Sequence, residues 1–376
     1  MKILFTGGGT GGHFYPIIAV AQELRDVIYE RKLIGTKFYF MSDHPYSEKL
    51  LRDNEIIFVN TPSGKWRRYF SLKNFTDIFV LMYGTIIALW RLFAIYPDVI
   101  FSKGGYASMP AAIAARILGI PFFIHESDSR PGRANLWAGK FAVRIALSYP
   151  DAAKYFKSDK TAVIGNPMRR EIMRPIPEGA KKFLKLEEDL PIILILGGSL
   201  GAQSINNAIL DALPELVTRY QIIHQTGKNN FEDISDRVKV ILENNPNARR
   251  YQPFPYLDNL AMRMAAGVAQ LVVSRAGSTI FEIATWGIPS IIIPIPEEVS
   301  HDQRSNAFAY ARSGGAVVME ETNLSPSIVV SEIDRILSSP EIQAEMRTGA
   351  KSFAQPEAGR KIAEEIIDIA FAHESR

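Results

Sequence analysis

The sequence predicts an α/β protein built from two halves of the Rossmann type, each with a parallel sheet. Short apolar runs alternate with segments of helix length along the chain, and glycine-rich turns follow several of these runs. The unit of strand, glycine turn and helix at residues 2–30 occurs again near 192–215. Because 376 residues are many for one domain, we expect two domains.

The first half is expected to begin with a buried strand at Lys2–Phe5, because this apolar run ends directly in glycine. A helix from about Tyr15 to Glu30 follows the glycine turn. Pro110 is expected in the first turn of a later helix, where proline is tolerated because the first N–H groups of a helix have no partner within it. The other strands of this half are expected at Phe38–Met41, Asp98–Ser102 and Pro121–His125.

The second half is expected to begin with a strand at Ile192–Leu196, an uninterrupted apolar run that ends in glycine. The halves join near Gly165-Asn166-Pro167, which predicts domains of residues 1–163 and 164–354. The last helix, about Glu357–Ala372, has no obvious strand partner, so residues 355–376 are expected to pack back on the first domain. The further strands of the second half are expected at Gln221–Gln225, Leu271–Ser274 and Ser290–Pro294.

Composition and charge exclude several classes of function. The chain has no cysteine, which excludes disulfides, thiol nucleophiles and cysteine-bound zinc. A net charge of +3 argues against general nucleic-acid binding, so no nucleic-acid partner is expected. The N-terminal apolar run is too short for a signal peptide, which predicts a cytoplasmic location. The uncharged stretch from Ile78 to Trp90 is expected to be too short to span a bilayer.

Three glycine-rich turns, at residues 7–12, 104–105 and 197–201, are candidate ligand sites. Glycine lets the backbone adopt positive φ and approach a ligand, and the following helix points its free N–H groups and positive end at that ligand. Such turns suit a phosphate, a diphosphate or sugar hydroxyls at the carboxyl edge of a parallel sheet. The alternative is a tight connection that binds nothing, but three turns, two of them in matching halves, favour a ligand.

The first turn also has the spacing of a dinucleotide-binding fingerprint, at Gly7, Gly9 and Gly12. It raises the alternative of an NAD(P)-dependent Rossmann enzyme, in which Asp43 would be the acidic residue after the second strand. His13 directly follows the last glycine, where the dinucleotide fold normally starts a tightly packed helix. Such an enzyme would also leave the glycine turn of the second half without a role.

Polar residues in the second half follow a predicted strand and enter a helix. Glu282 lies about one turn into that helix, where a carboxylate can accept two hydrogen bonds from the vicinal diol of a ribose. The alternative is a capping box of Ser278 or Thr279 with Glu282, which needs no ligand, and the spacing favours neither. Gln303 and Asn306 can share a helix face, where their amides suit sugar hydroxyls unless both are ordinary surface residues.

Together these motifs resemble the MurG family of peptidoglycan N-acetylglucosaminyltransferases, in glycosyltransferase family 28. The resemblance covers residues 1 to about 360, and its most diagnostic parts are the N-terminal glycine loop and the Arg-Ala-Gly segment. The segments that carry it, in the order of the family, are Gly8-Gly9-Thr10-Gly11-Gly12-His13 with Pro16, Lys103-Gly104-Gly105-Tyr106, His125-Glu126-Ser127-Asp128, Gly165-Asn166-Pro167-Met168-Arg169, Gly197-Gly198-Ser199, Arg275-Ala276-Gly277 and Gln303.

The resemblance implies a GT-B fold, in which two Rossmann-like domains with parallel sheets face each other across a cleft. It implies an inverting transfer of N-acetylglucosamine from UDP-N-acetylglucosamine (UDP-GlcNAc) to lipid I, undecaprenyl-pyrophosphoryl-N-acetylmuramyl-pentapeptide, which gives lipid II. The N-terminal domain would face the acceptor and the membrane, and the C-terminal domain would bind UDP-GlcNAc. The alternatives are another GT-B glycolipid glycosyltransferase and a UDP-GlcNAc epimerase.

The resemblance also implies roles for individual residues. Asp128 would contact the sugar from a position where many relatives have asparagine. The residues implied at the UDP group are Arg169 and Ser199 at the diphosphate, Leu257 near the uracil and Glu282 at the ribose. The residues implied near the sugar are Ser278, Thr279 and Gln303, with Thr10, Gly11 and Gly12 closing over the site from the first domain.

An inverting transfer needs a base for the acceptor hydroxyl and stabilisation of the charge on the departing UDP. His13 is the candidate base, because an unperturbed imidazole titrates near neutrality, and Glu126 is the alternative. His13 could instead only shape its loop. The sequence has no evident Asp-x-Asp metal site, so we expect no metal or other cofactor, and Arg169 together with a helix N-terminus would neutralise the diphosphate.

A lipid-linked acceptor requires contact with the bilayer, and one segment is suited to it. Five basic residues and a single acid lie between Lys65 and Arg91, interleaved with aromatic residues. We therefore expect peripheral docking on an anionic phospholipid surface at the cytoplasmic face of the membrane. The alternative is a core helix at 78–90 with solvated basic residues beside it. The patch is expected to contain Lys65, Trp66, Arg67, Arg68, Phe75, Phe79 and Trp90.

Overall fold

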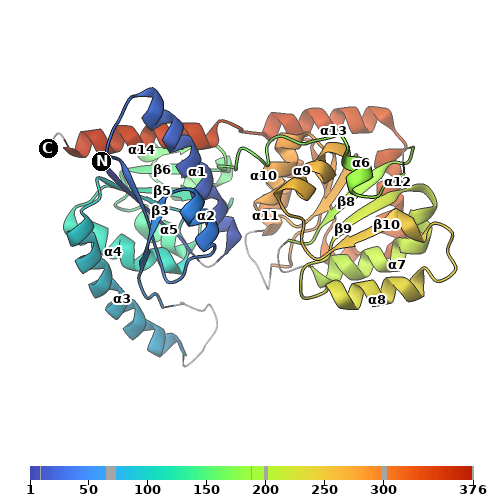
Figure 1. Cartoon of the computed structure of the whole chain (residues 1–376), viewed down its shortest axis with the longest axis horizontal. Coiled ribbons are helices and arrows are strands. Elements are labelled where there is room, and N and C mark those ends of the chain that lie inside the picture. Colours follow the sequence, from blue (N-terminus) through green and yellow to red (C-terminus); the bar gives the residue numbers. More distant parts are fainter. Residues whose placement is uncertain (9, 65–72, 188, 199–201, 298–302, 375–376) are drawn as a thin grey trace. The chain divides into compact units, whose positions relative to one another are not determined.

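The computed structural model divides the chain into two compact units. Unit 1 contains Met1–Arg169 and Gln355–Arg376, and unit 2 contains Arg170–Ala354. The structure describes all residues except 9, 65–72, 188, 199–201, 298–302 and 375–376. Each unit holds one sheet of parallel strands (Figure 1), and the predicted α/β class with two Rossmann-like domains is confirmed.

Unit 1 contains a 7-stranded sheet in the order β3-β2-β1-β4-β5-β6-β7. Side chains in its central strands, such as Ile3 and Phe101, are fully buried, because helices cover both faces of a parallel sheet. The strands are β1 (Lys2–Thr6), β2 (Lys37–Ser42), β3 (Ile56–Asn60), β4 (Val99–Ser102), β5 (Phe122–Glu126), β6 (Arg144–Leu147) and β7 (Thr161–Val163). The helices are α1 (Gly11–Glu30), α2 (Glu48–Asp53), α3 (Lys73–Ile95), α4 (Met109–Leu118), α5 (Arg133–Ala138) and α14 (Ala358–Glu374), with short 3-10 turns at Tyr106–Ser108, Pro150–Tyr155 and Ser158–Lys160.

Unit 2 contains a 6-stranded sheet in the order β10-β9-β8-β11-β12-β13. Apolar side chains fill both faces of this sheet, and its central strand β8 is buried along its whole length. The strands are β8 (Ile192–Leu196), β9 (Gln221–Gln225), β10 (Tyr251–Phe254), β11 (Leu271–Ser274), β12 (Ser290–Ile292) and β13 (Ala316–Val318). The helices are α6 (Ala180–Phe183), α7 (Gln203–Arg219), α8 (Phe231–Ile241), α9 (Asn259–Val268), α10 (Thr279–Trp286), α11 (Gln303–Ala311), α12 (Pro326–Leu337) and α13 (Pro340–Phe353), with short 3-10 turns at Ala248–Arg250 and Glu321–Asn323.

The C-terminal helix α14 belongs to unit 1, although the chain reaches it from unit 2. Its buried residues Ile362, Ile366 and Ile367 lie in the same apolar core as Val20 and Leu24 of α1. Figure 1 shows the helix, in red, alongside the rest of unit 1. The helix therefore adds its apolar face to the core of the first domain.

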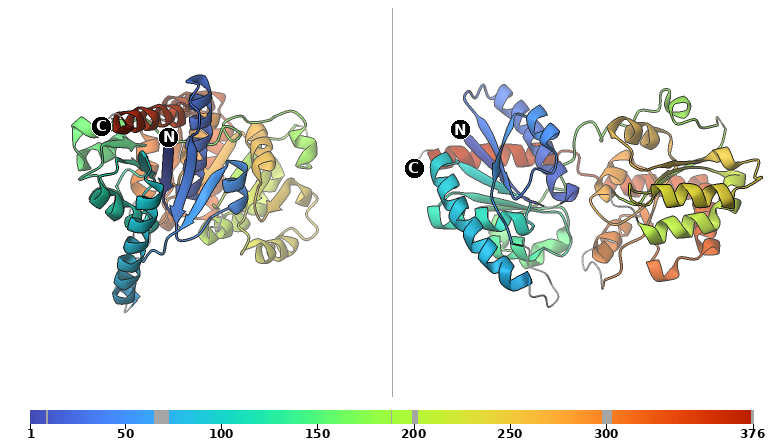
Figure 2. Two further views of the ribbon diagram at one scale, coloured as in Figure 1. Left: turned by 60° about the vertical axis from the view of Figure 1, so that its left-hand side comes forward. Right: turned by 60° about the horizontal axis from the view of Figure 1, so that its bottom comes forward.

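Helix α3 lies on the outside of unit 1, beside α4 (Figures 1 and 2). Gly84 permits this packing, because a Cβ at that position would lie only 1.8 Å from the carbonyl oxygen of Pro62. Ala88 and Leu92, one and two turns further on, are fully buried on the same side. Large apolar residues occupy the other side of the helix.

Candidate functional site

The strand order gives each sheet one point where a ligand site is expected. In both sheets the strand order runs outward from a central first strand and then continues on the other side of that strand. This switch point lies between β1 and β4 in unit 1 and between β8 and β11 in unit 2. Ligands of open parallel sheets bind outside the carboxyl ends of the strands at this switch point. The turns at residues 7–12 and 104–105 follow β1 and β4, and the turn at 197–201 follows β8. The described glycines of all three predicted turns thus lie at switch points.

The two glycine turns of unit 1 pack closely against each other. A Cβ on Gly8 would lie 2.2 Å from Cβ of Ala107, and a Cβ on Gly105 would lie 3.3 Å from the carbonyl oxygen of Gly8. Gly104 and Gly105 also have φ values of +78° and +82°, which L side chains rarely adopt. Glycine is therefore required here for the approach of one turn to the other, whether or not a ligand is bound.

Thr10 and His13 are brought together at the start of α1. Thr10 is the residue before the helix, and its hydroxyl oxygen lies 3.0 Å from Nδ1 of His13. The partly buried ring directs Nε2 toward the second glycine turn, since a Cβ on Gly105 would lie 3.5 Å from that nitrogen. Burial, and then the positive charge of Lys103, lower the pKa of His13 to about 4. At neutral pH the imidazole is therefore neutral, as a general base must be.

Glu126, the alternative base, is engaged by the loop that follows it. The side chain is only 3% exposed. One carboxylate oxygen accepts a hydrogen bond from the Asp128 N–H at 3.0 Å, and the other accepts from Gly132 N–H and Asn135 Nδ2, each at 3.0 Å. Burial and the negative charge of Asp128 raise the pKa of Glu126, while these hydrogen bonds oppose the rise. The geometry favours a role in holding the 127–135 loop over a role as the base.

Lys103 and His125 form a buried pair to which the sequence analysis gave no individual role. Lys103 follows β4 and His125 lies in the neighbouring strand β5, and Nζ is 2.5 Å from Nδ1. His125 Nε2 donates to the carbonyl oxygen of Gly165 at 2.9 Å, so Nδ1 accepts a hydrogen bond from Nζ of Lys103. Their positions at the ends of adjacent parallel strands were the available signal, because such ends meet at one edge of the sheet.

Asp43, which the dinucleotide hypothesis needs for a ribose, already has protein partners. Its carboxylate accepts a hydrogen bond from the Tyr106 hydroxyl at 2.9 Å, and His44 Nδ1 lies 2.8 Å from its other oxygen. Burial and Asp43 together raise the pKa of the Tyr106 hydroxyl, which keeps it protonated as the donor. This arrangement ties β2 to the second glycine turn and gives the NAD(P) alternative no support.

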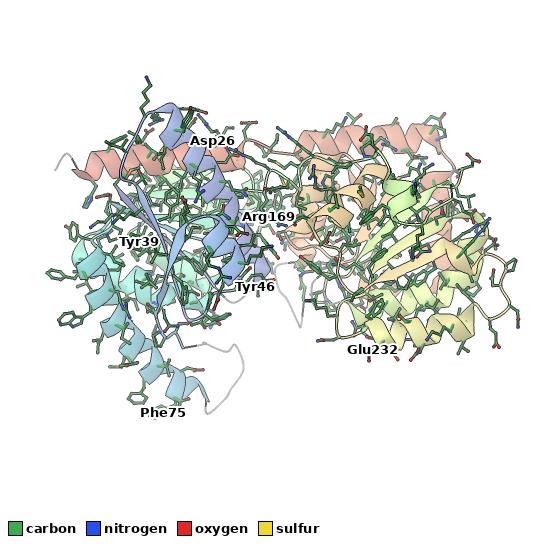
Figure 3. The ribbon with its side chains drawn as sticks, in the orientation of Figure 1. Asp26, Tyr39, Tyr46, Phe75, Arg169 and Glu232 are labelled. Carbon is green, nitrogen blue, oxygen red and sulfur yellow. The ribbon has the colours of Figure 1, made fainter. Side chains whose placement is uncertain are left out.

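Arg169, the last residue of the first segment of unit 1, lies against Tyr15 of α1. Its guanidinium carbon is 4.2 Å from the centre of the Tyr15 ring, and Tyr15 in turn contacts Tyr46. Arg169 and Tyr46 are labelled in Figure 3. A Cβ on Gly11 would lie 2.9 Å from the Tyr46 hydroxyl. Tyr15 therefore lies between Gly11 and Arg169, whereas the other residues implied at the UDP group belong to unit 2.

In unit 2, Gln225 connects two segments that were predicted to bind UDP. Its amide donates to the carbonyl oxygen of Gly198 at 3.3 Å and accepts from the N–H of Leu257 at 2.9 Å. The N–H of Leu257 is thus already used within the protein. Ser199 lies outside the described residues. Gln225 was predicted only as the end of a strand, so its role between these segments was missed.

The predicted ribose residue Glu282 lies in the first turn of α10, and Ser278 and Thr279 lie at its start. Ser278 occupies the capping position but makes no side-chain capping hydrogen bond, so a capping box through Ser278 is not formed. A Cβ on Gly277 would meet no atom within 4 Å, so the turn before the helix is open. The role of Glu282 at a ribose therefore stays a prediction.

A partly buried arginine and a buried asparagine fix the loops around α10. Arg275 donates to Glu321 at 2.6 Å and to the Ser204 hydroxyl at 2.7 Å, which joins α7, β11 and the segment after β13. Asn306, 1% exposed, donates to the carbonyl oxygen of Ala276 at 3.3 Å. Asn306 is therefore a buried support of this turn, and the idea that it is an ordinary surface residue is wrong. Gln303 begins α11 and accepts from the N–H of Ile295 at 3.4 Å.

The predicted membrane patch is described only in part, because Lys65, Trp66, Arg67 and Arg68 lie outside the described residues. The core-helix alternative is wrong, since Phe75, Phe79 and Trp90 of α3 are 68%, 57% and 75% exposed. The uncharged stretch from Ile78 to Trp90 lies within a longer helical segment, which is long and apolar enough to cross a bilayer by length and composition alone. The segment Phe75–Ile95 has 21 residues and contains an 18-residue window with a mean hydropathy of 2.0, because the helix continues past Trp90.

Comparison with known proteins identifies both halves of the chain. Residues 3–147 match the glycosyltransferase family 28 N-terminal domain, and residues 192–364 match the glycosyltransferase family 28 C-terminal domain. A relative from Bacillus thuringiensis subsp. konkukian is UDP-N-acetylglucosamine–N-acetylmuramyl-(pentapeptide) pyrophosphoryl-undecaprenol N-acetylglucosamine transferase 2. It is 36% identical over 370 residues, 98% of this chain and 99% of its own. The transferase of this kind from Clostridium novyi is 35% identical and covers 89% of this chain and 90% of its own.

Solved structures show the same fold. The crystal structure of Acinetobacter baumannii MurG matches with a TM-score of 0.75 and 25% identity, covering 98% of this chain and 99% of that one. A UDP-GlcNAc 2-epimerase from Neisseria meningitidis bound to UDP-GlcNAc matches with a TM-score of 0.65 but only 15% identity, covering 98% of this chain and 100% of that one. At that identity the second likeness concerns the fold alone, so it does not favour the epimerase alternative.

Proposed function

The chain belongs to glycosyltransferase family 28, and from this membership we infer that it transfers N-acetylglucosamine from UDP-GlcNAc to lipid I. The acceptor is the N-acetylmuramyl-(pentapeptide) pyrophosphoryl-undecaprenol named for its relatives, and the product is lipid II of peptidoglycan synthesis. The observation that carries this conclusion is 36% identity over 98% of the chain to one such transferase. Both family domains and both glycine-lined switch points agree with it.

We propose that unit 2 binds the donor and unit 1 binds the acceptor. Support for a donor site in unit 2 comes from Gln225, which links the Gly198 turn to Leu257, and from Glu282 at the open start of α10. Support for an acceptor site in unit 1 comes from the exposed apolar face of α3, which suits a polyprenyl carrier. Arg169, the last residue of the first segment of unit 1, would supply positive charge to a diphosphate.

His13 is proposed as the base of the transfer. With Nδ1–H donated to Thr10, Nε2 carries the lone pair and can take the proton of the acceptor hydroxyl. That oxygen then forms the new bond to the anomeric carbon as the bond to UDP breaks, and UDP leaves with the electron pair. Attack from the face opposite UDP inverts the anomeric carbon. Thr10 would fix the ring orientation that this transfer needs.

The direct test of the function is release of UDP from several UDP-sugars, with and without a soluble lipid I analogue. Release that requires both UDP-GlcNAc and the analogue, with a disaccharide product, is the expected result. Conversion of UDP-GlcNAc in the absence of the analogue would support an epimerase instead. Reduction of a nicotinamide cofactor would support the dinucleotide enzyme, and transfer only to other glycolipids would support a different GT-B transferase.

We expect the transfer to proceed without a divalent metal. Among the described residues, no group of three or more His, Cys, Asp or Glu is placed to hold a metal ion. In place of a metal ion, Arg169 and the N–H groups at a helix start are proposed to stabilise the leaving diphosphate. Initial rates should stay within about twofold when excess EDTA is added. Loss of activity in EDTA that magnesium restores would show that this expectation is wrong.

Replacing Glu282 by glutamine is expected to weaken donor binding. An amide keeps the size of the carboxylate but exchanges one of its two acceptor oxygens for a donor, so it cannot accept both hydroxyls of a ribose. The KM for UDP-GlcNAc should rise by roughly 10-fold or more, with a smaller change in kcat. Glu232→Gln, on α8 of the same unit (Figure 3), is the matched control and should leave both values unchanged. An unchanged KM in Glu282→Gln would remove the ribose role.

We further propose that the protein docks peripherally on anionic phospholipid through the exposed face of α3. The positions of the large exposed apolar residues support this proposal, because six of these residues recur at helical spacing on one side of α3. These residues are Phe75, Phe79, Met82, Ile86, Trp90 and Phe93. The basic residues of segment 65–68 adjoin the start of the helix in the sequence, where they would meet anionic headgroups at the cytoplasmic face.

A further inference from the structure

The ring of Tyr15 lies between the first glycine turn and Arg169. Tyr15 follows Gly11 by one turn of α1, and a Cβ on Gly11 would lie 3.0 Å from a carbon of this ring. The guanidinium carbon of Arg169 is 4.2 Å from the centre of the same ring, which is within the range of a cation–π interaction. The last residue of the first segment of unit 1 is thus held beside a turn from the beginning of the chain.

Tyr46 fixes the orientation of the Tyr15 ring. The two ring centres are 5.7 Å apart, and the rings are nearly perpendicular, at 77°. The Tyr46 ring also lies 5.2 Å from that of Phe14, and its hydroxyl would be 2.9 Å from a Cβ on Gly11. Burial, and then Tyr15, raise the pKa of Tyr46, whereas the positive charge of Arg169 opposes the rise. Tyr46, Tyr15 and Arg169 therefore form one cluster at the turn.

The backbone segment that leads to Arg169 is anchored in unit 1 as well. His125 Nε2 donates to the carbonyl oxygen of Gly165 at 2.9 Å, and Lys103 Nζ donates to Oδ1 of Asn166 at 3.4 Å. These contacts do not by themselves set the position of the guanidinium, because an arginine side chain has several rotatable bonds. The stack on the tyrosine ring restricts those bonds.

We propose that Tyr15, supported by Tyr46, is a positioning residue that orients the guanidinium of Arg169 for a diphosphate. Stacking uses the flat face of a guanidinium, whereas its N–H groups point outward in its plane. Two oxygens of a diphosphate can therefore meet the edge of the group while its face stays on the ring. The inference rests on the proposed function, in which Arg169 supplies positive charge to a diphosphate. Both substrates of that reaction, UDP-GlcNAc and the pyrophosphoryl acceptor, carry such a group.

The test is a double-mutant cycle of Tyr15→Leu and Arg169→Met in the full chain, with the Kd of UDP and of uridine measured for each protein. We expect Tyr15→Leu to weaken UDP binding by roughly 5- to 30-fold, because the guanidinium loses its stacking partner. Uridine, which has no phosphate, should bind as tightly as it does to the wild-type protein. In the Arg169→Met background, Tyr15→Leu should cause no further loss of UDP affinity.

A purely structural role of Tyr15 at the glycine turn predicts a different result. It would lower UDP affinity by the same factor with and without Arg169, and that outcome would reject the proposal. Tyr15→Phe should recover most of the loss, because a phenyl ring still offers its face to the guanidinium. Tyr155→Leu is the matched control, since Tyr155 is another tyrosine of unit 1 with a cation near its ring, Lys154 at 5.3 Å. It should leave UDP affinity unchanged.

The acceptor is the second source of a diphosphate, and a second measurement distinguishes it from the donor. The KM for a soluble lipid I analogue that keeps its diphosphate is determined for the same variants. A rise of this KM in Tyr15→Leu that needs Arg169, with UDP binding unchanged, would assign the cluster to the acceptor diphosphate. If neither ligand shows coupling between the two residues, the proposal is rejected.

Failure of this inference can be told apart from failure of the proposed function. If the wild-type protein binds UDP but makes no disaccharide, the proposed function fails, and the binding cycle still tests the cluster. If the protein is active and Arg169→Met affects neither ligand, the role of the cluster is overturned while the transfer stands. Should Tyr15→Leu fail to fold, Tyr46→Leu, at an exposed position, should give a smaller loss that also needs Arg169. No loss in Tyr46→Leu, or an equal loss without Arg169, would then overturn the proposal.

Discussion

Replacing His13 by alanine is expected to lower kcat by roughly 100- to 10,000-fold, with the fold retained. The ring is partly buried at the start of α1, and its loss removes the nitrogen proposed to take the acceptor proton. Thr10→Val should lose less, about 10-fold, because the ring remains but its orienting hydroxyl partner is gone. Single-turnover rates with a soluble acceptor analogue measure the chemical step apart from product release.

The pH dependence of the wild-type enzyme tests the same assignment. A pKa of about 4 for His13 means that the free base predominates above that value and is lost by protonation below it. The part of kcat/KM controlled by His13 should therefore be constant near neutrality and fall only as the pH approaches about 4. An NMR titration of His13 would measure this pKa directly.

Comparison of His13→Ala with Glu126→Gln shows which of the two residues is the base. Glu126→Gln keeps one acceptor oxygen for the loop and should act mainly on the KM for the acceptor, because the structure uses this carboxylate to hold residues 127–135. His373→Ala, in the C-terminal helix, is a histidine control and should retain full activity. A modest effect of His13→Ala together with loss of kcat in Glu126→Gln would assign the base to Glu126.

The sequence predicted the features of the fold that depend on local pattern. The central strands, such as β1 and β8, are uninterrupted apolar runs before glycine, and this pattern is easily recognised. Edge strands such as β7 and β13 have three residues each, which is too short for a periodic signal. Helix α1 begins at Gly11 and not near Tyr15, because Thr10 provides the helix start and the last two glycines of the loop form the first turn.

The candidate site was predicted only where a motif marked it. The glycine turns and Glu282 stood out in the sequence because their residue types are unusual after a strand. Gln225 and Lys103 did not, because their roles depend on partners from distant segments, Leu257 for one and Asn166 for the other. Similarly, only packing could show that Asp43 is held by Tyr106.

Replacing both Phe79 and Trp90 by glutamate is expected to reduce binding to anionic vesicles by roughly 100-fold or more. Each side chain is more than half exposed, and burying such a residue in the membrane interface contributes about 1.5–3 kcal/mol. Ten-fold in affinity corresponds to about 1.4 kcal/mol, so two such losses suffice before any repulsion by the lipid charge is counted. Co-sedimentation with vesicles of defined anionic lipid content measures the change.

The same variant distinguishes docking from a general defect. Transfer to a soluble acceptor analogue should stay within about twofold of wild type, whereas transfer to acceptor embedded in vesicles should fall with the binding. Tyr29→Glu is the matched control, because Tyr29 is 85% exposed and lies near Asp26, at the end of unit 1 opposite Phe75 (Figure 3). Equal vesicle binding by the α3 variant and the Tyr29 variant would reject this face.

The connections of α3 decide between docking on a membrane and crossing it. The helix links β3 to β4, two strands of the same sheet, so both of its ends must return to one domain. Crossing would also pull Ala88 and Leu92 away from α4 and separate Gly84 from Pro62, against which it packs closely. A helix that keeps this inner face on the protein can offer the bilayer only its outer face. We therefore expect high salt to weaken vesicle binding and alkaline carbonate to release the protein, whereas resistance to both would indicate that α3 spans the bilayer.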